Sequence, residues 1–219
     1  MKQKKRAMRL GTIIGSVCLL LILTVGPAQA IPLNLLLVDF PHITSGFIDV
    51  TYDAGAEQFV ASGFALTLAD GSGPPEIISF TSPNYNITST INALGNVSSG
   101  TLTITGTVGS FTSGTLLTGD LFAFGFRPEG GDPLEFLFVV TGGDLAASFG
   151  PIVGTILGGT NFGGSFAANF DNLINGIPGT GLGVNNTAPI PEPGTLSLML
   201  LGSGAFLAFL RKRRTTKIS

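Results

Sequence analysis

The chain has 219 residues and a formal net charge of −2, but residues 31–189 hold twelve of its thirteen acidic residues and only one base, Arg127. The net charge of that span is therefore near −11, and without a cationic surface it cannot neutralise phosphates, which excludes nucleic acid as a partner. The same span contains neither cysteine nor lysine, so disulfide stabilisation and covalent catalysis by these side chains are excluded as well.

Residues 1–30 have the pattern of a secretory signal peptide. Five Lys and Arg residues lie within residues 1–9, and an apolar run follows from Leu10 to Val25. Ala28 and Ala30 are the small residues expected at positions −3 and −1 of the cut. We therefore expect the export machinery and a signal peptidase to act on this end, with cleavage after Ala30. An uncleaved N-terminal anchor is the alternative.

Residues 31–175 are predicted to form an exported all-β domain. Over residues 101–108, threonines occupy every odd position and Leu, Ile, Gly and Val the even ones, which is typical of a strand with one buried face. Over residues 119–127, Phe122, Phe124 and Phe126 are predicted to share one face. Further strands are predicted at residues 46–52, 58–68, 76–81, 85–91, 135–141, 152–157 and 165–170. Short strands between Gly- and Pro-rich turns indicate an antiparallel β-sandwich or jelly roll, in preference to a closed barrel or a solenoid.

Two groups of acidic residues in this domain offer hard oxygen ligands. Asp49 and Asp53 are four residues apart, while Glu129, Asp132 and Glu135 surround a Gly-Gly pair. Calcium takes such ligands, although no EF-hand loop is present. We expect no cofactor and interpret the acids as residues that keep an exported domain soluble, with a structural Ca²⁺ as the alternative.

No residue is predicted to be catalytic. His42 is the only histidine, and a serine triad could recruit no other base. A glycosidase needs two carboxylates that face each other across a cleft, and no pair stands out among the twelve. We therefore expect no enzyme activity.

Residues 176–189 are rich in glycine and asparagine and are predicted to be a flexible linker. Such a linker would let the domain stand away from the membrane and would expose the segment that follows.

The C-terminal end combines a proline box, an apolar run and a basic cluster. Pro191 and Pro193 lack N–H groups and keep the box extended, which leaves Glu192 accessible. Residues 195–210 are predicted to enter the membrane as a helix of ~24 Å, short of the roughly 30 Å of hydrocarbon. The cations that would hold this end in the cytoplasm are Arg211, Lys212, Arg213 and Arg214.

This order of parts over residues 190–214 resembles the PEP-CTERM sorting signal of bacterial surface proteins. The residue before the first proline, frequently Val in that family, is Ile190 here. The resemblance implies an exosortase-type membrane enzyme that cuts near the box, in species that generally make extracellular polysaccharide. A plain C-terminal membrane anchor is the alternative.

These features together predict an exported, non-enzymatic protein of the cell envelope, cell surface or extracellular matrix. Its role would be structural or adhesive, near exopolysaccharide, which the rows of threonine hydroxyls could contact. One alternative is a Ca²⁺-dependent carbohydrate-binding module, although the chain has no Trp and only two tyrosines, Tyr52 and Tyr85. A carboxylate-dependent glycosidase is a further alternative.

Overall fold

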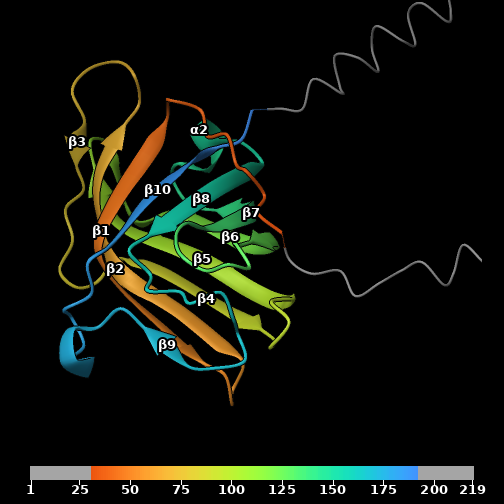
Figure 1. The fold of residues 1–219 in the computed structure, drawn as a ribbon. Helices are drawn as coiled ribbons and strands as arrows, with labels where there is room; N and C mark the ends of the chain where they lie inside the picture. Colours follow the sequence, from red (N-terminus) through yellow and green to blue (C-terminus); the bar gives the residue numbers. More distant parts are fainter. Residues whose placement is uncertain (1–30, 192–219) are drawn as a thin grey trace, which may run out of the picture.

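The computed structural model describes residues 31–191 (Figure 1). Within this part of the chain, no helix is long and apolar enough to cross a membrane. Several predicted features lie outside the described residues. At the N-terminal end this is the signal peptide, residues 1–30, which includes Ala28 and Ala30. At the C-terminal end these are Glu192 and Pro193 of the proline box, the apolar run 195–210 and the basic cluster 211–214.

Strands dominate the described residues, with two short helical turns between them. The strands are β1 His42–Asp53, β2 Gln58–Ala69, β3 Glu76–Ile77, β4 Tyr85–Ile91, β5 Val97–Val108, β6 Phe111–Gly125, β7 Leu134–Gly142, β8 Ile152–Gly158, β9 Phe170–Asp171 and β10 Gly183–Pro189. The helical turns are α2 Ala146–Phe149 and the 3₁₀ turn η1 Ile174–Gly176.

Eight of the strands close into an antiparallel barrel. They follow the order β2-β4-β5-β6-β7-β8-β10-β1, and β1 pairs back with β2. The all-β prediction is confirmed, but the sandwich or jelly roll is wrong. The reason is β1, which pairs with β2 along one edge and with β10 along the other, and whose register shifts on both sides help the sheet to curve. Closure leaves none of these eight strands with a free edge.

The strand that closes the barrel, β10, comes from the predicted linker. Asn185 pairs with Leu157 of β8 on one side and with Ser45 of β1 on the other. The flexible-linker prediction is therefore wrong for residues 183–189. The pattern was missed because the buried positions of β10 carry Gly183, Asn185 and Thr187, while Val184 is exposed.

Phenylalanine rings fill one part of the barrel interior. Phe124 of β6 lies 4.9 Å from Phe136 of β7 and 5.6 Å from Phe166, measured between ring centroids. Phe166 belongs to a loop, not to the strand predicted over residues 165–170, of which only the last residue lies in β9. Phe122 departs from the predicted phenylalanine face, since a register shift between Leu121 and Ala123 leaves it 70% exposed.

A small polar group is buried among these apolar side chains. The hydroxyls of Thr155 and Thr187 are 3.0 Å apart, and Thr187 donates to Oδ1 of Asn185 at 2.8 Å. Tyr85 approaches the two threonines, but its fully buried hydroxyl lacks a well-formed hydrogen bond among the described residues. Burial raises the pKa of Tyr85 above its usual range.

Candidate functional site

An extended arm, residues 31–38, crosses the outer wall of the barrel from β6 to β10. Near its start, the backbone N of Leu33 lies directly over Gly125 of β6. A Cβ atom at position 125 would lie only 2.6 Å from this nitrogen, so any side chain there would clash with the arm. At its end, the N–H of Val38 donates to the carbonyl oxygen of Pro189 at 3.1 Å. The arm therefore fits only because a glycine lies beneath it.

A buried carboxylate fastens the middle of this arm. Glu135 of β7 is only 6% exposed, and its two oxygens accept the N–H groups of Asn34 and Leu35 at 3.0 and 2.9 Å. Hydrogen bonds to a carboxylate are stronger than those between neutral groups. Glu135, which the sequence placed among possible calcium ligands, is thus a clamp for the N-terminal arm.

The sorting box begins at the same place on the barrel wall. Ile190, the residue after β10, donates its N–H to the carbonyl oxygen of Ile152 at 3.4 Å. Its side chain shares the space above Gly154 of β8 with Leu35 and Leu37 of the arm. Pro191 is exposed. Only Ile190 separates the barrel from the box, and we call this meeting of the arm, Gly154 and Ile190 the junction.

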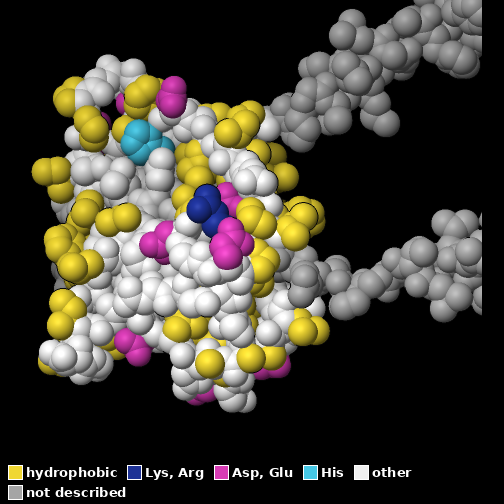
Figure 2. Space-filling view, viewed as in Figure 1, with side chains coloured by type: hydrophobic (Ala, Val, Ile, Leu, Met, Phe, Trp, Pro, Cys, Tyr) yellow, Lys and Arg dark blue, Asp and Glu magenta, His cyan; other side chains and the backbone are white. Residues whose placement is uncertain are grey.

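Exposed apolar side chains surround the junction. The arm and the strands beneath it contribute five that are 38–77% exposed, and we call them the apolar junction face: Ile31, Leu36, Phe122, Val139 and Ile152. Val139 and Ile152 are direct partners across β7 and β8. Figure 2 shows hydrophobic side chains on the side of the barrel from which both ends of the described chain leave, as well as on other parts of this view.

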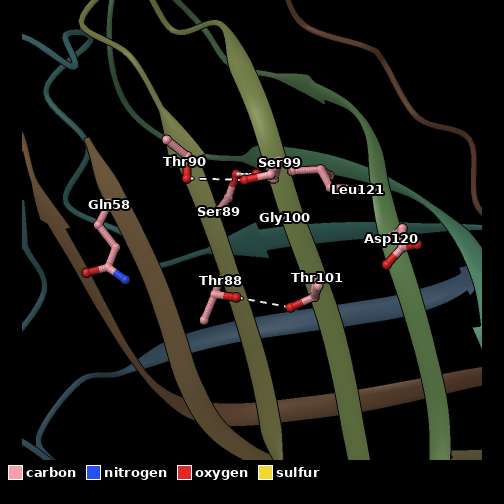
Figure 3. Close-up of a pocket in the computed structure, with 9 residues that line it drawn as sticks. All are labelled: Gln58, Thr88, Ser89, Thr90, Ser99, Gly100, Thr101, Asp120 and Leu121. Carbon is pink, nitrogen blue, oxygen red and sulfur yellow. Dashed lines mark hydrogen bonds between the residues drawn. The ribbon is translucent and has the colours of Figure 1, made fainter. Parts of the chain in front are cut away.

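A groove of about 400 Å³ lies on the adjoining outer wall, across β2, β4, β5 and β6 (Figure 3), and its β6 side borders the apolar junction face, because Asp120 pairs with Val139. Hydroxyls line it in pairs: those of Thr88 and Thr101 are 3.0 Å apart, and Ser99 donates to Thr90 at 3.2 Å. Asp120 adds an exposed carboxylate at the β6 side. The threonine row predicted in residues 101–108 thus contributes Thr101 to a polar groove that contains no aromatic ring.

Two of the other acids suggested as calcium ligands, Asp49 and Asp132, also fasten loops. Asp49 accepts the N–H groups of Gly179 and Gly181. Asp132 accepts those of Gly159 and Thr160, together with the Thr160 hydroxyl. Residues 31–191 contain no group of three or more His, Cys, Asp or Glu side chains that could hold a metal ion.

His42 was the only histidine considered for catalysis, and the structure brings one pair of carboxylates, Asp70 and Glu76, to the same pocket. His42 opens β1, donates from Nδ1 to the carbonyl oxygen of Asp39 at 2.6 Å, and stacks on Phe40. Asp70 and Glu76 line one pocket, where the N–H and hydroxyl of Ser72 lower the pKa of Asp70. A lowered pKa keeps Asp70 ionised, which does not suit the proton donor of a glycosidase.

At the junction, Pro191, the first residue of the proline box, follows the last strand of the barrel after only Ile190. Residues 189–214 match the family model of the PEP-CTERM protein-sorting motif. The tail carries this motif, as the sequence predicted, and the motif implies export to the cell envelope or surface and processing by an exosortase-type enzyme. No curated protein and no solved structure matches the chain.

Sequence reasoning found the box but missed the junction. The run Leu33–Leu37, apolar except for Asn34, was the available signal, because apolar residues directly after a signal peptide need a surface to cover. Gly125, Gly154 and Glu135 gave no signal, since nothing in their local pattern indicates that another segment crosses above them.

Proposed function

We propose that the protein is a non-enzymatic component of the cell surface or extracellular matrix, which an exosortase-type enzyme processes at Pro191, Glu192 and Pro193. One observation carries this proposal: the sorting motif starts at Pro189, the last residue of the strand that closes the barrel. Cleavage anywhere beyond Pro191 leaves every strand of the barrel in place. The released or transferred product is then a complete folded barrel.

The experiment compares the intact mass of the protein recovered from producing cells with that of Glu192→Ala. We expect the wild type to lack residues 1–30 and the tail from about Pro191 onward, and the variant to retain its tail. Glu129→Ala, which removes an exposed acid outside the box, is the control and should be processed like the wild type. A wild type that keeps its tail would show an ordinary anchor and contradict the proposal.

The hydroxyl groove supports a role near extracellular polysaccharide. Thr88, Thr101 and Asp120 present donors and acceptors of the kind that sugar hydroxyls bind, on an open wall that a long polymer could follow. Because the groove offers no aromatic platform, we propose weak contacts repeated over many copies, as in a matrix component, and not a single tight sugar site.

Replacing Thr88 and Thr101 together by Val tests this role. Each lost hydrogen bond is worth about 1 kcal/mol, so the loss of both should lower retention on the extracellular polysaccharide of the producing cells about thirtyfold. Thr44→Val removes an exposed hydroxyl from β1, outside the groove, and should leave retention unchanged. Equal losses in both variants would show that the groove has no special part.

A further inference from the structure

We infer that the apolar junction face lies against the lipid surface of the membrane while the sorting tail still holds the protein. This inference rests on the proposed function, because it concerns the exported form before processing. It adds an orientation and a contact surface that the sorting motif does not specify.

The first argument is the length of chain beyond the barrel. Pro191 is fixed near the wall through Ile190, and the apolar run begins at Thr195. Four residues of fully extended chain span at most about 14 Å. With the apolar run in the membrane, the junction therefore lies within about 14 Å of the point where the chain enters the membrane. Residues 183–189 of the predicted linker, which would have removed this limit, form a strand of the barrel.

The second argument is that the N-terminal end leaves from the same side. Ile31 lies over Gly125 of β6, and the apolar part of the predicted signal peptide ends at Val25. Six extended residues span about 20 Å. Before the signal peptide is removed, two short connections thus draw one side of the barrel toward the membrane (Figure 1).

The third argument is the chemistry of the surface so placed. The arm, residues 31–38, carries no charged side chain, in a span whose net charge is near −11. Acidic surfaces are repelled by anionic headgroups, whereas exposed apolar side chains partition into the interface. The apolar junction face is therefore suited to the lipid surface from which the rest of the acidic domain is repelled.

Site-specific fluorescence quenching tests the inference on the full chain. Cys18 is the only cysteine, so Cys18→Ser gives a background for single labels. Bimane is attached to cysteine at Val139 or Ile152 on the apolar junction face, or at Gln58 or Thr88 on strands across the barrel. Each variant is reconstituted into phosphatidylcholine vesicles that contain a lipid with a headgroup nitroxide.

We expect quenching at Val139 and Ile152 to be at least about threefold stronger than at Gln58 and Thr88, since nitroxide quenching requires close approach. In a Leu36→Asp, Phe122→Asp background, quenching at Ile152 should fall to the level of the opposite wall. Thr103→Asp, a matched charge outside this face, should change nothing. All three substitutions are at positions with solvent access, and the far-ultraviolet circular dichroism of each variant checks that the barrel has folded.

Equal quenching at all four positions, or no effect of the two aspartates, would overturn the inference and leave the proposed function intact. Flotation of the vesicles, which measures whether the chain binds the membrane at all, distinguishes failure of this inference from failure of the proposed function. A chain that does not float with the vesicles has no membrane-held form, and that result would overturn the inference together with the sorting proposal.

Discussion

Tyr85 is the residue whose pKa is most strongly changed by burial. Its ring is fully buried, and burial raises the pKa of its hydroxyl above the usual range. Tyr52, the only other tyrosine, has its pKa raised by burial and then by the nearby charges of Glu57 and Asp53. Both side chains therefore stay neutral in the folded barrel at a pH where they ionise in the unfolded chain.

The pH dependence follows from this difference. Above about pH 10 the unfolded state loses protons that the folded state keeps, so the free energy of unfolding falls by about 1.4 kcal/mol per pH unit for each such tyrosine. Below that pH neither tyrosine changes the stability. Urea unfolding of residues 31–191 between pH 8 and pH 12 measures the effect. Tyr85→Phe should flatten the decline, and an unchanged slope would contradict the assignment.

Among the elements, the N-terminal arm is held at its middle by one buried carboxylate, Glu135. Glu135→Gln keeps the size of the side chain but replaces one acceptor oxygen by an NH₂ group that faces a backbone N–H. We expect a loss of about 1–3 kcal/mol in the free energy of unfolding, because a partly buried N–H of Asn34 or Leu35 loses its acceptor.

Urea denaturation measures this loss, and Glu129→Gln serves as the control. Glu129 is exposed, and its replacement should change stability by less than about 0.5 kcal/mol. Similar values for the two variants would mean that Glu135 does not hold the arm. Hydrogen exchange at Asn34 and Leu35 provides an independent measurement, since loss of the Glu135 acceptor accelerates exchange at these two N–H groups.

How far the sequence predicts the elements depends on which side chains face inward. The predictions for β2 and β4 agree with the structure to within a residue. In β4 apolar and polar residues alternate, whereas β2 is an apolar-rich run in which burial alternates but polarity does not. Strand β10 was missed because its inward positions carry glycine, asparagine and threonine. Conversely, Phe166 gave residues 165–170 the pattern of a strand, although its ring enters the core from a loop.

Barrel closure could not be predicted from these patterns. Alternation identifies a strand and its buried face, but not the partner with which it pairs. The closing pairs join β1 to β10, at opposite ends of the described chain, and depend on β10, the strand that gave no apolar signal. Spacing along the chain likewise did not predict the contacts of the acidic residues. The sequence grouped Asp132 with Glu135, but in the structure Asp132 binds the loop at Thr160 and Glu135 binds the N-terminal arm.

For the whole molecule, composition and closure together predict unusual resistance to trypsin. Arg127 is the only Lys or Arg within residues 31–189, and it precedes Pro128, which blocks cleavage after it. Residues 31–191 should therefore survive trypsin even in urea. Pro128→Ala should be cut once, after Arg127, and much faster in urea than in buffer. Fragments from the wild type, followed by mass spectrometry, would contradict this prediction.

The continuity of β10 with the sorting box also sets an order of events in time. A chain exported from its N-terminus delivers β10 after all the other strands, and the barrel cannot close before β10 arrives. The box follows only one residue later. Completion of folding and arrival of the cleavage signal at the membrane are therefore nearly simultaneous. A chain that fails to fold would present its box on a loose end, whereas in a correctly folded chain the box begins one residue after a strand of the closed barrel.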